Sequence, residues 1–161
     1  MAGGLDWIVQ FDPPKNLETF VHRAGRTARA GSCGNCILFL LSHELDFLKL
    51  LKVRNLDCQE YIAPHRIETV KLEKIKEKLL EDRADYNRAS SGFIGHVRSY
   101  KELDLKYIFK FAKLDIADLA KAYSLASIPH VKEFPHIDRT EEEGKGFKVS
   151  KIPFRNKNQE K

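Results

Sequence analysis

Two short apolar runs near the N-terminus constrain the fold of this 161-residue chain. Residues 7–12 read Trp-Ile-Val-Gln-Phe-Asp, and residues 36–41 read Cys-Ile-Leu-Phe-Leu-Leu. Short, nearly continuous apolar runs are typical of strands in a parallel sheet that is covered on both faces. A helix is expected between them, from the N-cap residue Asn16 to about Ala28. Strand, helix and strand predict a βαβ unit with parallel strands, and therefore an α/β fold.

The end of this expected helix carries a dense cluster of cations. Residues 22–29 read His-Arg-Ala-Gly-Arg-Thr-Ala-Arg, with three arginines and no acid. On a helix with about 100° per residue, apolar residues from Phe20 to Ala28 share one stripe. The opposite side would carry three basic residues: His22, Arg26 and Arg29. Such a forked cationic face suits phosphate recognition, and Gly25 would let a phosphate or another backbone approach closely. A solvated basic face is the alternative, although such faces normally carry acids among the bases.

The cluster matches the HRxGRxxR motif of the DEAD-box helicases of superfamily 2, in the second of their two RecA-like domains. Residues 7–14 resemble the strand before that motif, and Gly31 with residues 36–41 resembles the loop and strand after it. Residues 91–101 and 114–125 resemble the helical C-terminal extension of nucleolar members that act in assembly of the large ribosomal subunit. The chain is therefore similar to the C-terminal portion of such a helicase.

This resemblance implies roles for the motif residues. In the family, ATP with Mg²⁺ binds between the two RecA-like domains, and RNA lies across both. The positions that match Arg26 and Arg29 act as catalytic arginine fingers, which stabilise the charge that spreads over the γ-phosphate oxygens. Coupling between the ATP site and the first domain is implied for four further positions: Asp12, His22, Arg23 and Gly25.

The sequence departs from the family pattern at its start. Gly4-Leu5-Asp6 imitates a family motif whose aspartate contacts the ATP ribose, but Asp6 lies too close to Asp12 for that role. The P-loop and the Asp-Glu-Ala-Asp motif of the first domain do not occur in the sequence. Those parts of the first domain supply most of the residues that bind ATP and Mg²⁺. The chain is therefore expected to be a helicase fragment that is inactive as an ATPase by itself.

Three regions are predicted along the chain. Residues 1–62 are expected to form a partial helicase C-terminal domain, in which Ser42 caps a helix after the second strand. Residues 63–137 are expected to form the helical extension, and residues 138–161 a basic, mostly disordered tail. The predicted fold is thus a truncated RecA-like βαβ unit, followed by an all-helical extension and a disordered tail.

The extension shows helical periodicity from its start. Residues 66–88 alternate acids and bases around apolar positions, which predicts one long amphipathic helix. The sequence Ser-Ser-Gly at residues 90–92 is expected to end it. Three shorter helices are expected to follow, over residues 93–100, 103–112 and 114–126. The last of them starts with an acidic first turn, which contains Asp115 and Asp118.

Basic residues alternate with aromatic ones in the extension, and the net charge is +5. Lysine and arginine side chains can form ion pairs with phosphates, and aromatic rings can stack on unpaired nucleotides. The candidate RNA-binding residues are Arg98, Lys101, Lys106, Lys110, Lys113, Lys145, Lys148, Lys151, Arg155 and Lys157. The aromatic residues among them are Phe93, Tyr100, Tyr107, Phe109 and Phe111. Their helical spacing also fits a buried core, so phosphate contacts are expected to dominate over stacking.

The cysteines do not indicate a metal site. Cys33 and Cys36 have the C-x-x-C spacing, but Cys58 is the only further cysteine, and structural zinc requires four ligands. Three cysteines fit reduced thiols in the nucleus or cytosol. The sequence contains no run of about 18 apolar residues, so no membrane span is expected.

The resemblance implies pre-ribosomal RNA and pre-ribosomal particles as partners, and a location in the nucleus and nucleolus. The residues themselves leave a second function open. The helices and basic tail could form a non-catalytic RNA-binding or scaffold module that is derived from such a helicase.

Overall fold

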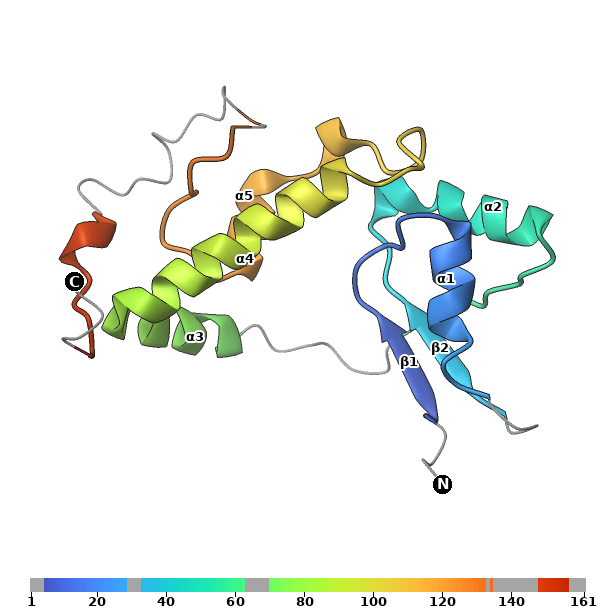
Figure 1. Cartoon of the computed structure of the whole chain (residues 1–161), viewed down its shortest axis with the longest axis horizontal. Coiled ribbons are helices and arrows are strands. Elements are labelled where there is room, and N and C mark those ends of the chain that lie inside the picture. The colour runs from blue at the N-terminus through green and yellow to red at the C-terminus, as the bar shows by residue number, and fades with distance from the viewer. Residues whose placement is uncertain (1–4, 29–32, 63–69, 133, 135–147, 157–161) are drawn as a thin grey trace. The chain divides into compact units, whose positions relative to one another are not determined.

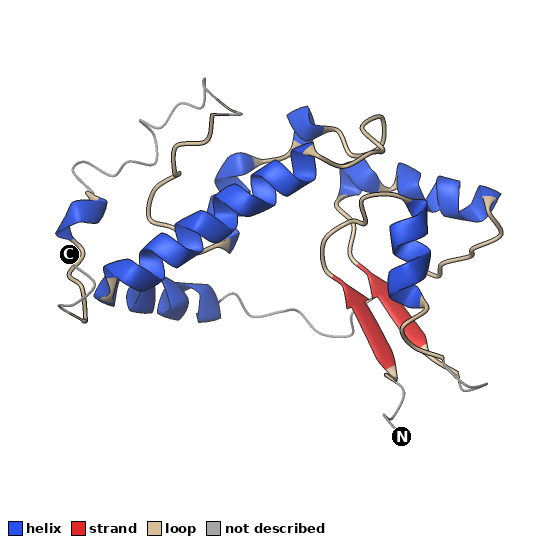
Figure 2. Cartoon of the chain, in the orientation of Figure 1, coloured by secondary structure: helices blue, strands red, loops and turns tan. Residues whose placement is uncertain are grey.

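The computed structural model describes residues 5–28, 33–62, 70–132, 134 and 148–156 (Figure 1). The chain divides into two compact units. The first unit comprises Met1–Tyr61 and Tyr100–Lys113, and the second comprises Ile62–Ser99 and Leu114–Lys161. Figure 2 shows that both strands belong to the first unit and that the regular structure of the second is helical. No helix in the described residues is long and apolar enough to cross a membrane.

The first unit contains the predicted parallel βαβ arrangement. Strand β1 (Trp7–Gln10) pairs in parallel with β2 (Asn35–Leu38), with Trp7 opposite Asn35 and Gln10 opposite Leu38. Helix α1 (Leu17–Ala24) connects them. This confirms a truncated RecA-like unit followed by a helical portion.

The expectation of a sheet covered on both faces is not met in the described part of the chain. Trp7 and Val9 of β1 are more than half exposed, as is Phe11 immediately after it. The side chains of Phe39 and Leu41, which follow β2, are half exposed. The two strands and the single helix that connects them do not supply a covering layer for both faces of the sheet.

Helix α1 begins as predicted but ends four residues early. Asn16 is its N-cap, and the Asn16 Oδ1 atom accepts a hydrogen bond of 2.9 Å from the Thr19 amide. The helix ends at Ala24, and the Gly25 amide closes it by donating to the Val21 carbonyl at 2.8 Å. The predicted helical face that runs through Ala28 is therefore wrong. Ala28 has a φ of 55°, so the chain has left the helical path there.

The next helix starts differently from the prediction. A short 3₁₀ turn, η2 (Ser42–Glu44), precedes helix α2 (Asp46–Val53). The turn is closed by the Glu44 carboxylate, which accepts a 2.8 Å hydrogen bond from the Leu41 amide, rather than by a Ser42 cap.

Aromatic side chains from distant parts of the sequence build the first core. The rings of Phe20 and Phe47 lie 5.9 Å apart, and those of Phe47 and Phe109 lie 5.4 Å apart. Other buried side chains of this core are Leu51, Tyr100, Leu103 and Ile108. Residues 100–113 thus complete the first unit, although the sequence suggests that they belong to the extension. The helix predicted over 103–112 is wrong, because these residues form turns that lead into the 3₁₀ turn η3 (Phe111–Lys113).

Two helices replace the single long one predicted at the start of the extension. Helix α3 (Val70–Glu81) ends before Asp82, and helix α4 (Arg83–Lys101) follows directly. The Asp82 carboxylate accepts a 2.9 Å hydrogen bond from the Ala84 amide, so this residue starts a new helix. Residues 63–69, where the predicted helix would begin, lie outside the described residues.

The predicted break at residues 90–92 is also wrong, because α4 continues through them. Phe93 and Val97 are completely buried, and this packing outweighs the low helix propensity of glycine. The Tyr123 ring lies over Gly92, where an added Cβ would meet it at 3.4 Å.

The second unit has a core of its own. Helix α5 (Ile116–Ala122) is shorter than the helix predicted over 114–126, and the acidic residues expected at its start lie there. Asp115 is the N-cap, and its carboxylate accepts a 2.9 Å hydrogen bond from the Asp118 amide. The buried side chains of this unit are Tyr86, Phe93, Val97, Leu114, Ile116, Ala120, Leu125, Ile128, Val131 and Ile152. The Tyr86 hydroxyl accepts a 3.3 Å hydrogen bond from the Ser127 amide, which ties α4 to the chain after α5.

Part of the predicted tail packs in this second unit. Residues 148–156 include the 3₁₀ turn η4 (Val149–Lys151), and Ile152 is buried. The Arg83 backbone amide donates to the Pro153 carbonyl at 2.8 Å, and its Nε donates to the Ile152 carbonyl at 2.9 Å. This stretch is therefore ordered, while residues 135–147 and 157–161 lie outside the described residues.

Candidate functional site

The last turn of α1 joins two of the predicted coupling residues. The Arg23 Nη1 atom donates a 3.4 Å hydrogen bond to the carbonyl of Asp12, which follows β1. His22 is exposed, and its Nε2 lies 3.9 Å from a carboxylate oxygen of Glu18, one turn earlier. The structure thus connects the end of the strand to the arginine motif.

Arg26 lies in the turn after the helix, and its side chain is exposed. The described residues offer its guanidinium no hydrogen-bond or ion-pair partner, so its donors are available to a ligand. Arg29 lies outside the described residues, as does Gly31. Arg26 itself lies beyond the end of α1, so it is not part of the predicted helical face.

Thr27 fixes this turn to the rest of the unit. Its buried hydroxyl donates to the Leu5 carbonyl, and Thr27 and Leu5 form a parallel bridge. The Thr27 side chain also lies directly against Gly34, where an added Cβ would overlap it. Neither contact is predictable from the sequence, because both depend on how the chain packs and not on a local pattern.

Gly25 has no approaching chain in the described structure. Its φ is −69°, and an added Cβ would meet the Val21 carbonyl of its own helix at 3.3 Å. Its suggested role in close approach to a phosphate stays a prediction.

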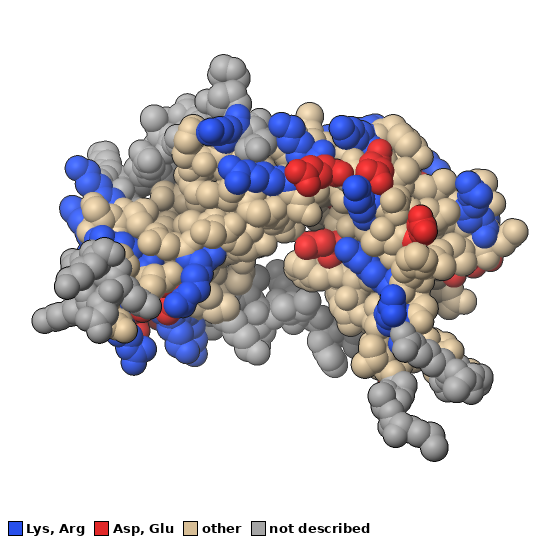
Figure 3. Space-filling view, in the orientation of Figure 1, with Lys and Arg blue, Asp and Glu red and all other residues tan. Residues whose placement is uncertain are grey.

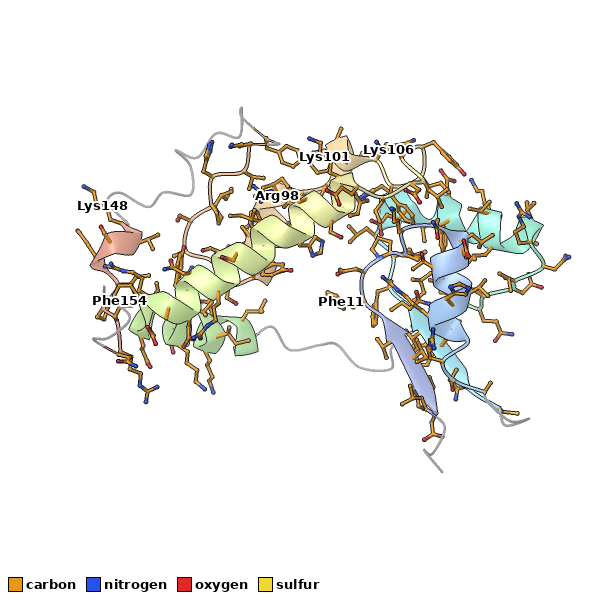
Figure 4. The ribbon with its side chains drawn as sticks, viewed as in Figure 1. Phe11, Arg98, Lys101, Lys106, Lys148 and Phe154 are labelled. Atoms are coloured by element: carbon orange, nitrogen blue, oxygen red, sulfur yellow. The ribbon has the colours of Figure 1, made fainter. Side chains whose placement is uncertain are left out.

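The described members of the predicted RNA-binding set are all exposed. They are Arg98, Lys101, Lys106, Lys110, Lys113, Lys148, Lys151 and Arg155. Lys145 and Lys157 lie outside the described residues. In the first unit, basic side chains with interspersed acids cover the surface of residues 100–113 (Figure 3). Figure 4 labels Lys101 and Lys106 on this segment.

The lysines of this segment have electrostatic effects on their surroundings. The hydrogen bond from Lys49, at 2.7 Å, is the main cause that lowers the pKa of Asp46, and the charges of Lys110 and Lys113 lower it further. Lys101 lies above the Phe111 ring, with its Nζ 6.0 Å from the centroid. The positive charge of this surface is thus only partly compensated.

The aromatic residues between these lysines and arginines differ in their burial. Phe93, Tyr100 and Phe109 are buried, as the alternative of a packed core predicts. Phe111 is half-buried, whereas Tyr107 is 65% exposed. Among Tyr100, Tyr107 and Phe109, only the Tyr107 ring is exposed enough to stack on a nucleotide base.

A buried polar cluster was not visible in the sequence. The Tyr100 hydroxyl donates a 2.6 Å hydrogen bond to Oε1 of Glu44, and the His43 Nε2 lies 3.2 Å from the same hydroxyl. Burial and the contact with Glu44 raise the pKa of Tyr100 well above its ordinary value. No local sequence pattern predicts this cluster, because Tyr100 lies 56 positions after Glu44.

All three cysteines are free and lie at the surface. Partial desolvation of the Cys58 thiol, followed by the effects of Cys36 and Asp57, raises the pKa of this thiol above its ordinary value. Within the described ranges, no group of three or more His, Cys, Asp or Glu side chains could hold a metal ion. The exposed guanidinium of Arg26 carries donors that a phosphate could accept from, and the described residues offer no cluster of ligands for Mg²⁺.

Two family models match the chain. The helicase conserved C-terminal domain matches residues 3–31, and the C-terminal extension of the SPB4-like ATP-dependent rRNA helicases matches residues 82–131. A parallel βαβ unit with an arginine-rich turn, joined to this helical extension, defines a RecA-like helicase segment.

Individual relatives agree with these models. DEAD-box ATP-dependent RNA helicase 49 of Arabidopsis thaliana is 34% identical over 162 residues, which cover 98% of this chain and 29% of the relative. ATP-dependent RNA helicase DDX55 of Homo sapiens is 33% identical over 171 residues, which cover 100% of this chain and 28% of the relative. ATP-dependent RNA helicase HAS1 of Mycosarcoma maydis is 41% identical over 128 residues, which cover 79% of this chain and 22% of the relative.

The chain belongs to the DEAD-box RNA helicase family and corresponds to the C-terminal portion of its members. It spans less than a third of the length of these relatives.

Proposed function

We propose that this chain is the C-terminal part of an ATP-dependent RNA helicase that remodels ribosomal RNA during assembly of the large subunit. The observation that supports this most strongly is the exposed guanidinium of Arg26, which has no partner among the described residues. Its turn is anchored by the Thr27 contact with Leu5 and follows the contact of Arg23 with Asp12. A cation that is held in place but left unpaired suits recognition of a ligand phosphate.

Arg26 and Arg29 act on the γ-phosphate in this proposal. The planar guanidinium of Arg26 donates hydrogen bonds to the phosphoryl oxygens, and it stabilises the negative charge that they carry in the transition state. Lysine could supply the charge but not the fork of donors. ATP with Mg²⁺ is held mainly by the N-terminal RecA-like domain of the helicase, which supplies the nucleotide and metal chemistry.

His22, Arg23, Gly25 and Asp12 couple this site to the N-terminal domain. The hydrogen bond between Arg23 and the Asp12 carbonyl links the end of β1 to the last turn of α1. A displacement of the motif on contact with the first domain would therefore reach the strand end. His22 is exposed at the same turn and is available for such a contact.

RNA binds to the exposed basic side chains of residues 98–113 and of the C-terminal stretch. Pre-ribosomal RNA and pre-ribosomal particles are the proposed partners, and the nucleus and nucleolus are the proposed location. The names of the matching models and relatives, which refer to rRNA and RNA helicases, support this assignment.

The arginine-finger role is tested in a chimera. The present chain replaces the aligned stretch of ATP-dependent RNA helicase DDX55, and RNA-stimulated ATPase activity is measured. Loss of an arginine finger reduces the rate by about 10³- to 10⁵-fold, and we expect Arg26→Ala to fall near this range. Arg26→Lys is expected to recover little, because lysine lacks the fork. Arg54→Ala, an exposed arginine at the end of α2, is the matched control and should retain full activity.

Two results would contradict this assignment. One is an Arg26→Ala activity within a few-fold of the parent chimera, and the other is an equal loss in Arg54→Ala. The 161-residue chain alone is expected to show no ATPase activity above background, because its sequence contains no P-loop. A chain that binds RNA but gives an inactive parent chimera would favour the non-catalytic RNA-binding or scaffold module.

A further inference from the structure

Tyr107 is an exposed aromatic residue on a firmly anchored backbone. The side chain of Tyr107 is 65% exposed, whereas the next two residues, Ile108 and Phe109, are almost completely buried. The amides of Ile108 and Phe109 both donate to the Leu105 carbonyl at 2.9 Å. The Phe109 ring is in turn held by Phe47 and Tyr100. The backbone that carries the Tyr107 ring is therefore fixed, and stacking on a base would have to order only the side chain.

The residues around Tyr107 make this surface positive. Residues 100–113 contain four lysines and two acids. Among the described residues, no carboxylate lies within ion-pair distance of Lys106, Lys110 or Lys113. Asp104, in contrast, is engaged, because one of its oxygens lies 3.6 Å from Lys15 and the other accepts a 2.9 Å hydrogen bond from Asn16. The uncompensated charge near Tyr107 is thus mostly cationic.

We propose that Tyr107 stacks on an unpaired base of single-stranded RNA, while Lys106 and Lys110 contact the adjacent phosphates. This inference rests on the proposed RNA-binding function and names one contact within it. A flat aromatic face beside a basic surface is the combination that binds single strands with little sequence preference. In a duplex the bases are already stacked on one another, so a duplex offers Tyr107 no free base face.

Single-stranded RNA fits this surface better than an apolar protein partner. Tyr107 is the only large exposed apolar side chain of residues 100–113, so this segment by itself offers no contiguous apolar patch for a protein to cover. The exposed aromatics at Trp7 and Phe11 differ in this respect, because they lie with other exposed apolar residues of β1.

The experiment measures RNA affinity of the full 161-residue chain by fluorescence anisotropy over a series of salt concentrations. The first probe is an unstructured, labelled single-stranded RNA. The second is a strand of the same length with abasic sites in place of the bases, and the third is the matching duplex. We expect Tyr107→Ala to weaken binding to the first probe by roughly 5- to 150-fold, the range for loss of one base–aromatic stack. Its salt dependence should be unchanged, because no phosphate contact is lost.

The remaining variants separate stacking from charge and from folding. Tyr107→Phe and Tyr107→Trp should bind like the parent, whereas Tyr107→Leu, which keeps apolar area but has no π face, should bind like Tyr107→Ala. Lys106→Gln and Lys110→Gln combined should lower the salt slope by about 0.7 for each charge removed. Tyr61→Ala is the matched control, because Tyr61 is 74% exposed in the same unit but follows Glu60.

The outcomes distinguish the inference from the proposed function. The stacking inference is wrong if Tyr107→Ala binds like the parent, or if it loses equal affinity for the abasic strand or the duplex. If the lysine variants nevertheless bind RNA more weakly, the proposed basic RNA-binding surface is still supported. If the parent chain binds none of the probes, both the RNA-binding function and the stacking contact are wrong.

Discussion

The hydroxyl of Tyr100 donates a 2.6 Å hydrogen bond to Oε1 of Glu44, across 56 positions of sequence. Glu44 is 1% exposed, and its second carboxylate oxygen accepts a hydrogen bond from the Leu41 amide. A buried carboxylate is tolerated only when such donors satisfy it. The last turn of α4 is therefore fixed to the 3₁₀ turn that precedes α2, and residues 100–113 belong to the first unit.

Tyr100→Phe should destabilise the first unit. The substitution leaves Glu44 without its closest donor, which costs about 1–3 kcal/mol of the free energy of unfolding. Urea unfolding followed by fluorescence of Trp7, the single tryptophan, reports on this unit. Tyr107→Phe removes an exposed hydroxyl from the same segment and should change the free energy by less than about 0.5 kcal/mol. A loss in both variants of the same size would argue against a special role for the Glu44 contact.

The same pair predicts a pH dependence of stability. The folded-state pKa of Tyr100 is raised, mainly by burial and then by Glu44, so folding favours the protonated hydroxyl. Its contribution is fully present below the ordinary tyrosine pKa of about 10 and is lost as pH rises above it. The stability difference between the parent chain and Tyr100→Phe should therefore shrink above that pH. Urea unfolding at neutral pH and at successively higher pH tests this, and a constant difference would contradict it.

Two glycines should respond in opposite directions to alanine. At Gly34 a Cβ would overlap the Thr27 hydroxyl and lie 2.7 Å from the Ala28 amide nitrogen, so Gly34→Ala should destabilise by about 1–3 kcal/mol. At Gly95, inside α4, a Cβ would meet nothing within 4 Å. Gly95→Ala should therefore stabilise by about 0.5–1 kcal/mol, through helix propensity.

The Gly34 substitution also bears on the arginine motif. Because Thr27 anchors the turn of Arg26, Gly34→Ala in the helicase chimera should lower ATPase activity more than Gly95→Ala does. Equal activities in the two chimeras would show that the position of the turn does not depend on the packing of Thr27 against Gly34.

Arg83 should hold the C-terminal stretch in place. Its guanidinium donates to the Ile152 and Ser150 carbonyls and lies 4.7 Å from the centroid of the Phe154 ring. Arg83→Ala should release residues 148–156, which hydrogen–deuterium exchange would detect as faster exchange of their amides. Arg88→Ala is the control, because this exposed arginine of the same helix pairs with Asp85 instead. Unchanged exchange in Arg83→Ala would show that burial of Ile152 alone holds the stretch.

Local features were predictable from the sequence because the interactions behind them span a few residues. The Asn16 cap joins its side chain to an amide three residues later, and the residue type and position predict it. The acidic start of the last helix is likewise predictable, although its cap at Asp115 appears only in the structure. The parallel βαβ unit follows from two apolar runs with a helix between them. The arginine motif and its family were likewise readable, because they depend only on residue identity and spacing.

The tertiary structure decided where elements end and which of them pack together. Helix α1 ends at Ala24 because Thr27 bonds to Leu5, and α4 continues through Gly92 because Phe93 and Val97 are buried. Each of these outcomes depends on partners that local propensity does not contain.

The candidate sites divide in the same way. The sequence alone determined that Arg26 and the lysines of residues 101–113 are the chemically capable groups. It could not determine that Tyr100 and Phe109 are buried while Tyr107 is exposed, since all three are aromatic residues among the same lysines. Burial is set by long-range contacts, here the Phe47 ring and the Glu44 carboxylate, and only the folded chain brings these together.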